Sequence, residues 1–191
     1  MLKNLNDKIV ILASQSTRRQ ELLSDLGITF EVISKPIKEI FPSEMKPHLI
    51  AEYLAKMKSS VFNPKRNEII ITADTVVIHN NKVYNKPKNL QEAKDILCNL
   101  SSSTHKVITG VCIYQKNNQF CFSELTKVQF KELSEKEINY YLNNFNASDK
   151  AGAYGIQDWI GKIGIKSIHG SYTNVMGLPL TELYDNLKKI L

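Results

Sequence analysis

The chain of 191 residues lacks several signatures that would place it in a common class. No apolar run approaches the roughly 20 residues that a membrane-spanning helix needs, so we expect no membrane partner. The three cysteines, Cys98, Cys112 and Cys121, follow no metal-binding spacing and lie in apolar segments. We interpret them as small core residues of a protein from a reducing cytoplasm.

Basic residues are abundant, but they are not gathered into one patch. The 25 lysines and arginines outnumber the 19 acidic residues and give a net charge of +6. Such a charge suits nucleic acids, acidic membranes and small anionic substrates. The lysines are scattered, and no basic helix, aromatic RNA-binding signature or zinc finger accompanies them. We therefore expect no nucleic-acid partner and favour a small anionic substrate.

The order of apolar patterns predicts an α/β fold with a mixed sheet, because short strands alternate with helices. Runs with strand character cover residues 9–12, 30–33, 69–71, 76–78, 106–114 and 120–130. The last two are predicted to form a hairpin that turns at Asn117-Asn118. Helical spacing covers residues 18–26, 48–60, 90–100, 134–145 and 180–191. Ser134 and Glu137 predict a capping box, and residues 148–179 are glycine-rich and predicted to be irregular.

The most informative segment follows the first predicted strand. Ser14, Ser16 and Thr17 precede Arg18 and Arg19, where a helical pattern begins. A strand, a hydroxyl-rich turn and a helix start together gather free backbone N–H groups around an anion. Two guanidinium groups add bidentate reach to phosphate. The glycines and the Gly-Lys-Ser/Thr ending of a Walker loop are absent, so the segment indicates another kind of phosphate site.

A carboxylate follows the isoleucine-rich run at residues 69–71. Asp74 stands where α/β sheets place ligands, although an acidic residue there also forms ordinary turns. Lys58 ends an amphipathic helix, Lys86 precedes a proline, and Glu39 lies in a loop. Each alone is typical of a surface. Together with the arginine pair they suit metal-assisted attack on a polyphosphate, in which cations neutralise charge on the leaving pyrophosphate.

Two later segments carry polar groups that also suit a ligand site. Tyr154 and Gln157 lie in the glycine-rich run 149–157 and are candidates to read a base by stacking and amide hydrogen bonds. His105, at the entrance of a predicted strand, is a candidate general base. The alternative that we favour for His105 is a structural histidine.

These motifs, in this order, resemble the Maf family of nucleoside triphosphate pyrophosphatases. The resemblance spans nearly the whole chain and includes S-x-S-P-R-R at 14–19, A-D-T at 73–75, K-P at 86–87, S-x-x-H-x-V-x-T at 102–109, D-K-A-G-A-Y-G-I-Q at 149–157 and G-L-P at 177–179. The block at 149–157 is complete and is the most specific. Two positions depart from the family pattern. Thr17 replaces the usual proline and would cap a looser turn, and Lys38 replaces a common acid, which would weaken metal binding if that acid is the ligand.

The resemblance implies a single Maf-like nucleotide pyrophosphatase domain over residues 1–191. Its fold would be a mixed twisted sheet with flanking helices and two lobes around a central cleft, similar to the inosine triphosphate pyrophosphatases. The activity implied is cleavage of dTTP, UTP and modified pyrimidine nucleotides to the monophosphate and pyrophosphate by a cytoplasmic homodimer that uses Mg²⁺ or Mn²⁺. The alternative that stays open is a nucleotide-binding regulator of septum formation with little catalysis.

The resemblance also assigns roles by motif position. Asp74 would be the proton acceptor. The combination that looks like the dTTP- and UTP-cleaving branch is Arg18, Thr75 and Gln157. The residues implied to bind phosphate are Ser14, Arg18, Arg19, Lys58 and Lys86. The base would meet Tyr154 and Gln157, and the metal would meet Glu39 and Asp74.

Overall fold

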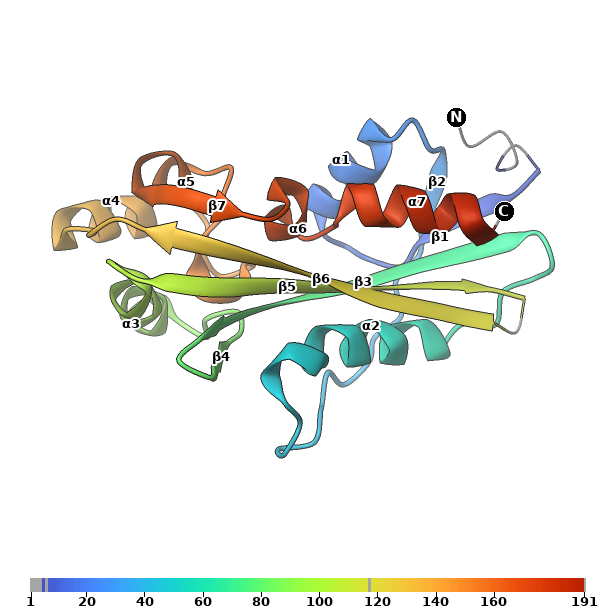
Figure 1. Ribbon diagram of the computed structural model, residues 1–191, viewed down its shortest axis with the longest axis horizontal. Helices are drawn as coiled ribbons and strands as arrows, with labels where there is room; N and C mark the ends of the chain where they lie inside the picture. The colour runs from blue at the N-terminus through green and yellow to red at the C-terminus, as the bar shows by residue number, and fades with distance from the viewer. Residues whose placement is uncertain (1–4, 6, 117, 191) are drawn as a thin grey trace. The chain divides into compact units, whose positions relative to one another are not determined.

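The computed structural model describes residues 5, 7–116 and 118–190 and divides into two compact units. The first comprises the described parts of residues 1–74, 109–124 and 177–191, and the second comprises residues 75–108 and 125–176. Three long strands contribute residues to both: β3 (Glu68–His79), β5 (Thr104–Gln115) and β6 (Asn118–Phe130) (Figure 1). Each unit therefore combines segments that are far apart in the sequence.

The first unit is built around a buried parallel strand. β1 (Ile9–Leu12) pairs in parallel with β2 (Phe30–Val32) and with the first part of β3, so that Leu12 lies opposite Val32 and Ile71. The strand order in this unit is β2-β1-β3-β5-β6. The last three residues of β1 are buried, as expected for a parallel strand that reads as a continuous apolar run.

Helices cover both faces of these strands. α1 (Thr17–Asp25) and α7 (Leu180–Ile190) lie on one side of the sheet of this unit, and α2 (Ile50–Ser60) lies on the other (Figure 1). α2 follows the short 3₁₀ turn η2 (Pro47–Leu49) and buries a face that includes small residues. Such cover on both faces is what a parallel pair requires, because its strands have no face suited to water.

The second unit carries antiparallel pairs. β4 (Lys82–Tyr84) pairs with the end of β3 across a turn in which Asn80 and Asn81 adopt positive φ, as a two-residue hairpin turn demands. β7 (Ile165–His169) pairs antiparallel with β6. The strand order is β3-β5-β6-β7, with β4 beside β3. Parallel and antiparallel pairs make the sheet mixed, which confirms the predicted fold class.

The helices of the second unit are α3 (Leu90–Leu100), α4 (Glu135–Asn144), α5 (Trp159–Gly164) and α6 (Tyr172–Met176). α4 opens with the predicted capping box, in which Ser134 and Glu137 bond reciprocally. The core of this unit gathers α3, α4, α5 and the strands around the fully buried Leu97 and Tyr141. The cap and the core fix where α4 starts and which face it buries.

The structure differs from the sequence pattern in specific places. The strands predicted at 69–71 and 76–78 are one continuous strand, β3. Residues 148–179, predicted to be irregular, include α5, β7 and α6. The predicted hairpin turn and the end of the last helix fall partly outside the described residues, which omit Asn117 and Leu191.

The interpretation of the three cysteines as small core residues is confirmed for Cys112, which is fully buried, but it is wrong for Cys98 and does not anticipate a disulfide. Cys112 of β5 and Cys121 of β6 form a disulfide, with their Cα atoms 4.0 Å apart. Cys98 is free, and it is exposed on α3 rather than buried. The pairing depends on the register of two neighbouring strands, which the nine-residue separation alone does not specify.

Candidate active site

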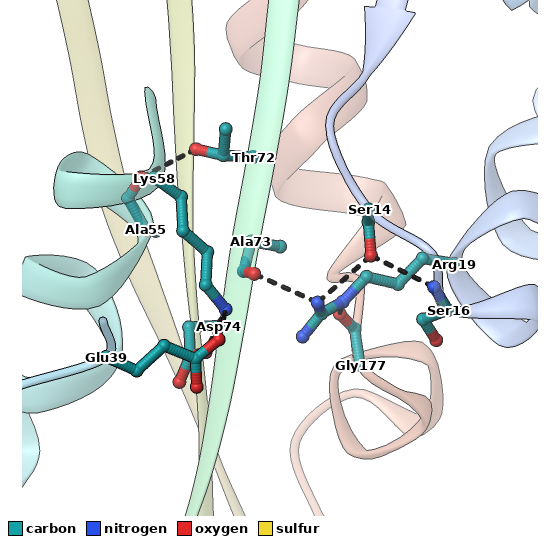
Figure 2. Close-up of polar contacts among 10 residues, drawn as sticks. All are labelled: Ser14, Ser16, Arg19, Glu39, Ala55, Lys58, Thr72, Ala73, Asp74 and Gly177. Atoms are coloured by element: carbon teal, nitrogen blue, oxygen red, sulfur yellow. Dashed lines mark hydrogen bonds and ion pairs between the residues drawn. The ribbon is translucent and has the colours of Figure 1, made fainter. Parts of the chain in front are cut away.

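Three charged side chains from separate segments meet in the first unit. Lys58 Nζ lies 2.5 Å from Asp74 Oδ1 and 2.8 Å from Glu39 Oε1 (Figure 2). The side chains of Lys58 and Asp74 are 17% and 12% exposed, whereas that of Glu39 is 50% exposed. We call these three residues the Lys58 cluster. The Lys58 ammonium group is therefore largely shielded from water. It lies between the enclosed carboxylate of Asp74 and the solvent-exposed carboxylate of Glu39.

Local structure explains why this cluster forms. Lys58 lies in the last turn of α2, and Asp74 lies on β3 at the end of the part that belongs to the first unit. Two residues before Asp74, the Thr72 hydroxyl donates a 2.7 Å hydrogen bond to the carbonyl oxygen of Ala55. Alternate residues of a strand share a face, so Thr72 and Asp74 both address α2. Glu39 reaches Lys58 from the loop that precedes η2.

The other side of β3 is held by Arg19. Its Nε donates to the carbonyl oxygen of Gly177 at 2.8 Å, and its Nη1 donates to Ala73 O at 2.9 Å and to Ser14 Oγ at 3.4 Å (Figure 2). Burial lowers the pKa of the Arg19 guanidinium, while the charge of Asp74 acts in the opposite direction. Arginine keeps its charge at neutral pH in any protein environment. Arg19 therefore fixes the residue next to Asp74 and holds a positive charge there.

The predicted phosphate turn lies at the start of α1. Ser14 is buried, and its hydroxyl accepts a 3.3 Å hydrogen bond from the backbone N–H of Ser16. Ser16 is the N-cap residue and Thr17 is the first helical residue, so the expectation that Thr17 caps the helix is wrong. Arg18 follows in the first turn and is half-buried. The turn thus brings a buried hydroxyl, a helix N-terminus and two arginines together.

The remaining predicted residues belong to the second unit. Thr75 directly follows Asp74 on β3 and is half-buried. Lys86 is exposed and precedes the buried Pro87. Gln157 is half-buried, and its Oε1 atom is enclosed without a hydrogen-bond partner among the described residues. An enclosed amide oxygen without a donor is costly, so it suits a ligand that brings an N–H group.

Tyr154 is more enclosed than a stacking platform for a base would be. It is 5% exposed, and its hydroxyl lies 2.7 Å from His105 Nε2. The rings of Tyr154, His105 and Phe130 meet edge to face, with centroids 4.9–5.4 Å apart. Burial, with a smaller effect of His79, lowers the pKa of His105 to about 3. His105 is therefore neutral at physiological pH, and these contacts support its structural interpretation.

Acid is expected to destabilise the protein through His105. Its pKa is about 3 in the folded protein and near 6.5 in the unfolded chain, so the unfolded chain takes up the proton first as the pH falls. The free energy of unfolding should decrease between pH 6.5 and 3, by up to about 1.4 kcal/mol per pH unit. Urea midpoints at pH 7 and pH 5 should differ more for the parent than for His105→Gln. Equal differences would contradict this role.

The segment that carries Gln157 is held at several points. Tyr141 donates its hydroxyl to Asp158 Oδ2 at 2.8 Å and accepts the backbone N–H of Gly155 at 3.2 Å. Gly152 has a φ of +72°, and a Cβ atom there would lie 2.8 Å from Val77. Only glycine fits such a position without strain. The spacing of glycine and tyrosine within 149–157 thus has a packing cause in this chain.

The Lys58 cluster suits a divalent cation that acts together with phosphate. Within the described part of the chain, no group of three or more His, Cys, Asp or Glu side chains gathers at one point. Mg²⁺ in phosphate-processing sites takes one or two carboxylates and completes its shell with phosphate oxygens and water. Asp74 and Glu39, which share one ammonium group, fit that requirement. Glu39 rather than its neighbour Lys38 supplies the contact, so the Lys38 departure leaves this carboxylate in place.

Sequence reasoning missed two residues that shape the cluster. Thr72 joins β3 to α2, as described above. Gly110 of β5 lies so close to α2 that a Cβ atom would stand 2.3 Å from the backbone nitrogen of Glu52. A hydroxyl residue directly after the isoleucines of residues 69–71 was the available signal for Thr72. Nothing in the sequence around Gly110 indicates which helix approaches it.

Curated proteins resemble the chain over its whole length. A protein named dTTP/UTP pyrophosphatase from Phocaeicola vulgatus is 49% identical over 193 residues, which cover 100% of both chains. One of the same name from Flavobacterium psychrophilum is 47% identical, over 95% of this chain and 94% of its own. Separately, none of the described helices has the length and apolar content needed to cross a bilayer.

Solved structures resemble the chain in fold, and a family model matches most of its sequence. The Ham1 protein of Staphylococcus aureus matches with a TM-score of 0.53 and 12% identity, covering 96% of this chain and 100% of its own. A HAM1 protein from Coxiella burnetii matches with a TM-score of 0.51 and 13% identity, over 95% and 99%. These likenesses confirm the predicted fold class. A family model described as Maf-like protein matches residues 9–190, and the chain therefore belongs to the family of Maf-like proteins.

Proposed function

We propose that the protein is a nucleoside triphosphate pyrophosphatase that cleaves dTTP and UTP to the monophosphate and pyrophosphate. The relatives from Phocaeicola vulgatus and Flavobacterium psychrophilum carry this activity in their names. The observation that carries the proposal is the Lys58 cluster, in which Asp74 lies 2.5 Å from a lysine ammonium. A carboxylate held beside a cation suits proton transfer at a polyanionic substrate.

Asp74 is the proposed proton acceptor. Its carboxylate takes a proton from a water molecule whose oxygen attacks the α-phosphorus. The new oxygen–phosphorus bond forms as the bond between the α-phosphorus and the bridging oxygen breaks, and pyrophosphate leaves with that electron pair. Lys58 orients the carboxylate and offsets part of the negative charge that gathers around the α-phosphate. Arg19 supports this geometry through Ala73.

The phosphates are proposed to bind Ser14, Arg18, Arg19, Lys58 and Lys86. The start of α1 contributes backbone N–H groups, and the arginines contribute fixed charge. The charge of Arg19 acts mainly at a distance, because its Nε and Nη1 already donate to protein oxygens. These groups would neutralise the leaving pyrophosphate before its bond breaks.

Asp74 and Glu39 would hold a divalent cation, Mg²⁺ or Mn²⁺. When bound, such an ion supplies Lewis-acid polarisation of the phosphate oxygens. The chain's own part is to present two carboxylates at one point, which the shared contact with Lys58 achieves. We expect Lys58 to exchange part of its contact with these carboxylates for contact with phosphate when substrate binds.

The pyrimidine preference is assigned to Arg18, Thr75 and Gln157, with Tyr154 shaping the base site. Uracil and thymine present an imide N–H between two carbonyl groups. The enclosed Oε1 atom of Gln157 is an acceptor that this N–H would satisfy, and the side-chain N–H₂ group would serve a carbonyl. Tyr154 contributes by holding the segment in place through His105 rather than by offering an open ring face.

We further propose that residues 1–191 act as a single domain in a cytoplasmic homodimer, without a nucleic-acid or membrane partner. The scattered distribution of lysines along the sequence supports the absence of a nucleic-acid partner. The small anionic substrate supports the cytoplasmic location, where nucleotide pools are kept. Its proposed role there is housecleaning of the nucleotide pool.

Product analysis tests the function directly. The purified protein is incubated with common and methylated nucleoside triphosphates, with and without Mg²⁺ or Mn²⁺, and pyrophosphate and orthophosphate are measured separately. We expect pyrophosphate from dTTP, UTP and 5-methyl-UTP, only when metal is present. Release of orthophosphate would identify a phosphatase instead. Nucleotide binding without either product would favour the regulator of septum formation.

A further inference from the structure

Two contacts between α2 and β3 run side by side. The Thr72 hydroxyl donates to Ala55 O at 2.7 Å, and Lys58 Nζ contacts Asp74 Oδ1 at 2.5 Å (Figure 2). Thr72 and Asp74 are two residues apart on a strand and therefore face the same way. Ala55 and Lys58 are three residues apart on a helix and therefore lie on one side of it. The Thr72–Ala55 contact and the Lys58–Asp74 contact are therefore neighbours, and both join the same face of β3 to the same side of α2.

Where α2 comes closest to the sheet, packing alone leaves the position of the helix along its axis incompletely specified. α2 buries Ile50 and Leu54 as well as the small residues Ala51, Ala55 and Ser59, and Ala51 lies where the sheet comes closest to the helix. On the sheet side, Gly110 brings backbone against backbone, because an added Cβ atom would lie 2.3–2.4 Å from Ala51 and Glu52. Small residues allow close approach but offer few protruding side chains that interlock. A directed hydrogen bond between the strand and the helix can fix the position of α2 along its axis at such a contact.

Packing of the core does not require a hydroxyl group at Thr72. Thr72 is fully buried in a strand whose other buried positions are mostly isoleucine and valine, and valine has nearly the same shape as threonine. A buried hydroxyl costs free energy unless it is hydrogen-bonded. Its partner, Ala55 O, is a helix carbonyl with a second lone pair available. The Thr72 hydroxyl is therefore better explained by its role in positioning α2 than by a contribution to the stability of the core.

We propose that Thr72 is a positioning residue that sets Lys58 against Asp74 by anchoring α2 at Ala55. The inference rests on the proposed function, because it acts through the proton acceptor and its cation. Loss of the hydroxyl leaves the core filled but lets α2 shift along the sheet. A displacement of about 1 Å in a catalytic group can cost up to about 10²-fold in turnover.

Three variants test the proposal. For Thr72→Val we expect kcat for dTTP to fall about 10- to 100-fold with KM changed less than threefold. Thr72→Ser keeps the hydroxyl and should restore kcat to within about threefold of the parent. Thr126→Val is the matched control, because Thr126 is equally buried on β6 and its hydroxyl bonds Ser171 and Asn174 in the second unit. This control should lower thermal stability and leave kcat unchanged.

A second readout does not depend on activity. Lys58, with 17% of its side chain exposed, should react several-fold faster with an amine-reactive reagent in Thr72→Val, as read by mass spectrometry. Lys65, which is 81% exposed, should react at an unchanged rate and serves as the internal reference. If the parent releases no pyrophosphate, the proposed function fails, and Lys58 labelling alone decides the positioning role. Unchanged kcat and labelling in Thr72→Val, or equal losses in Thr72→Ser, would overturn the inference.

Discussion

Asp74→Asn is expected to lose about 10²- to 10⁴-fold in pyrophosphate release from dTTP and UTP. The amide cannot accept the proton from the attacking water, although its oxygen can still accept a hydrogen bond from Lys58. The fold should survive, because Lys58 keeps Glu39 at 2.8 Å as a charged partner. Turnover is measured with saturating metal, and the thermal midpoint is measured alongside to show that the variant is folded.

The control for this substitution removes a carboxylate elsewhere. Asp25 is exposed at the end of α1, so Asp25→Asn makes the same chemical change outside the site. It should keep turnover within about twofold of the parent, as expected for a surface substitution away from special features. Turnover in Asp74→Asn that approaches that of Asp25→Asn would remove Asp74 from its proposed role, whatever the state of the rest of the cluster.

Gly110→Ala is expected to lower the free energy of unfolding by about 3 kcal/mol or more. The new Cβ atom would lie 2.3 Å from the backbone nitrogen of Glu52, and a helix backbone cannot move aside as a flexible side chain can. α2 must then shift from β5, which carries Lys58 away from Asp74. Urea unfolding measures the loss of stability, and pyrophosphate release should fall with it even under conditions where the variant is folded.

Gly27→Ala separates this packing effect from the general effect of replacing a glycine. Gly27 has a φ of +70° and nothing within 4 Å of the added carbon, so its substitution costs only backbone strain. That strain amounts to about 1–2 kcal/mol. If the free energy of unfolding of Gly110→Ala is no lower than that of Gly27→Ala, α2 accommodates the methyl group and does not pack directly against the backbone of β5 at Gly110.

The elements that local pattern determines were predicted well. The strand at 9–12 and the helix at 90–100 have the predicted bounds, because a buried parallel strand and an amphipathic helix leave clear apolar patterns. β3 was predicted as two strands, because Thr72 and Asp74 interrupt its apolar run. Their partners, Ala55 and Lys58, lie on a helix that the local pattern around residue 72 cannot reveal.

The candidate site was predicted in its residues but not in its contacts. The motifs indicated Asp74, Lys58 and Glu39 as a set, whereas the ammonium group shared by both carboxylates is a long-range result of how α2 packs. Arg19 was predicted to contact phosphate, and the structure adds its three bonds to protein oxygens. β7 was missed because it is defined by its pairing with the distant β6, in which Lys127 lies opposite His169, and the local pattern around residues 165–169 does not reveal that partner.

The disulfide between β5 and β6 makes the chain a reporter of the conditions from which it is isolated. Lys116, exposed and the sole trypsin site between Cys112 and Cys121, splits the polypeptide when cut. With the sulfur–sulfur bond closed, the two fragments migrate together on a denaturing gel until a thiol is added. With the bond open, they separate at once. A sample whose free thiols are alkylated at lysis, before trypsin is added, thus records whether the compartment it came from was oxidising or reducing.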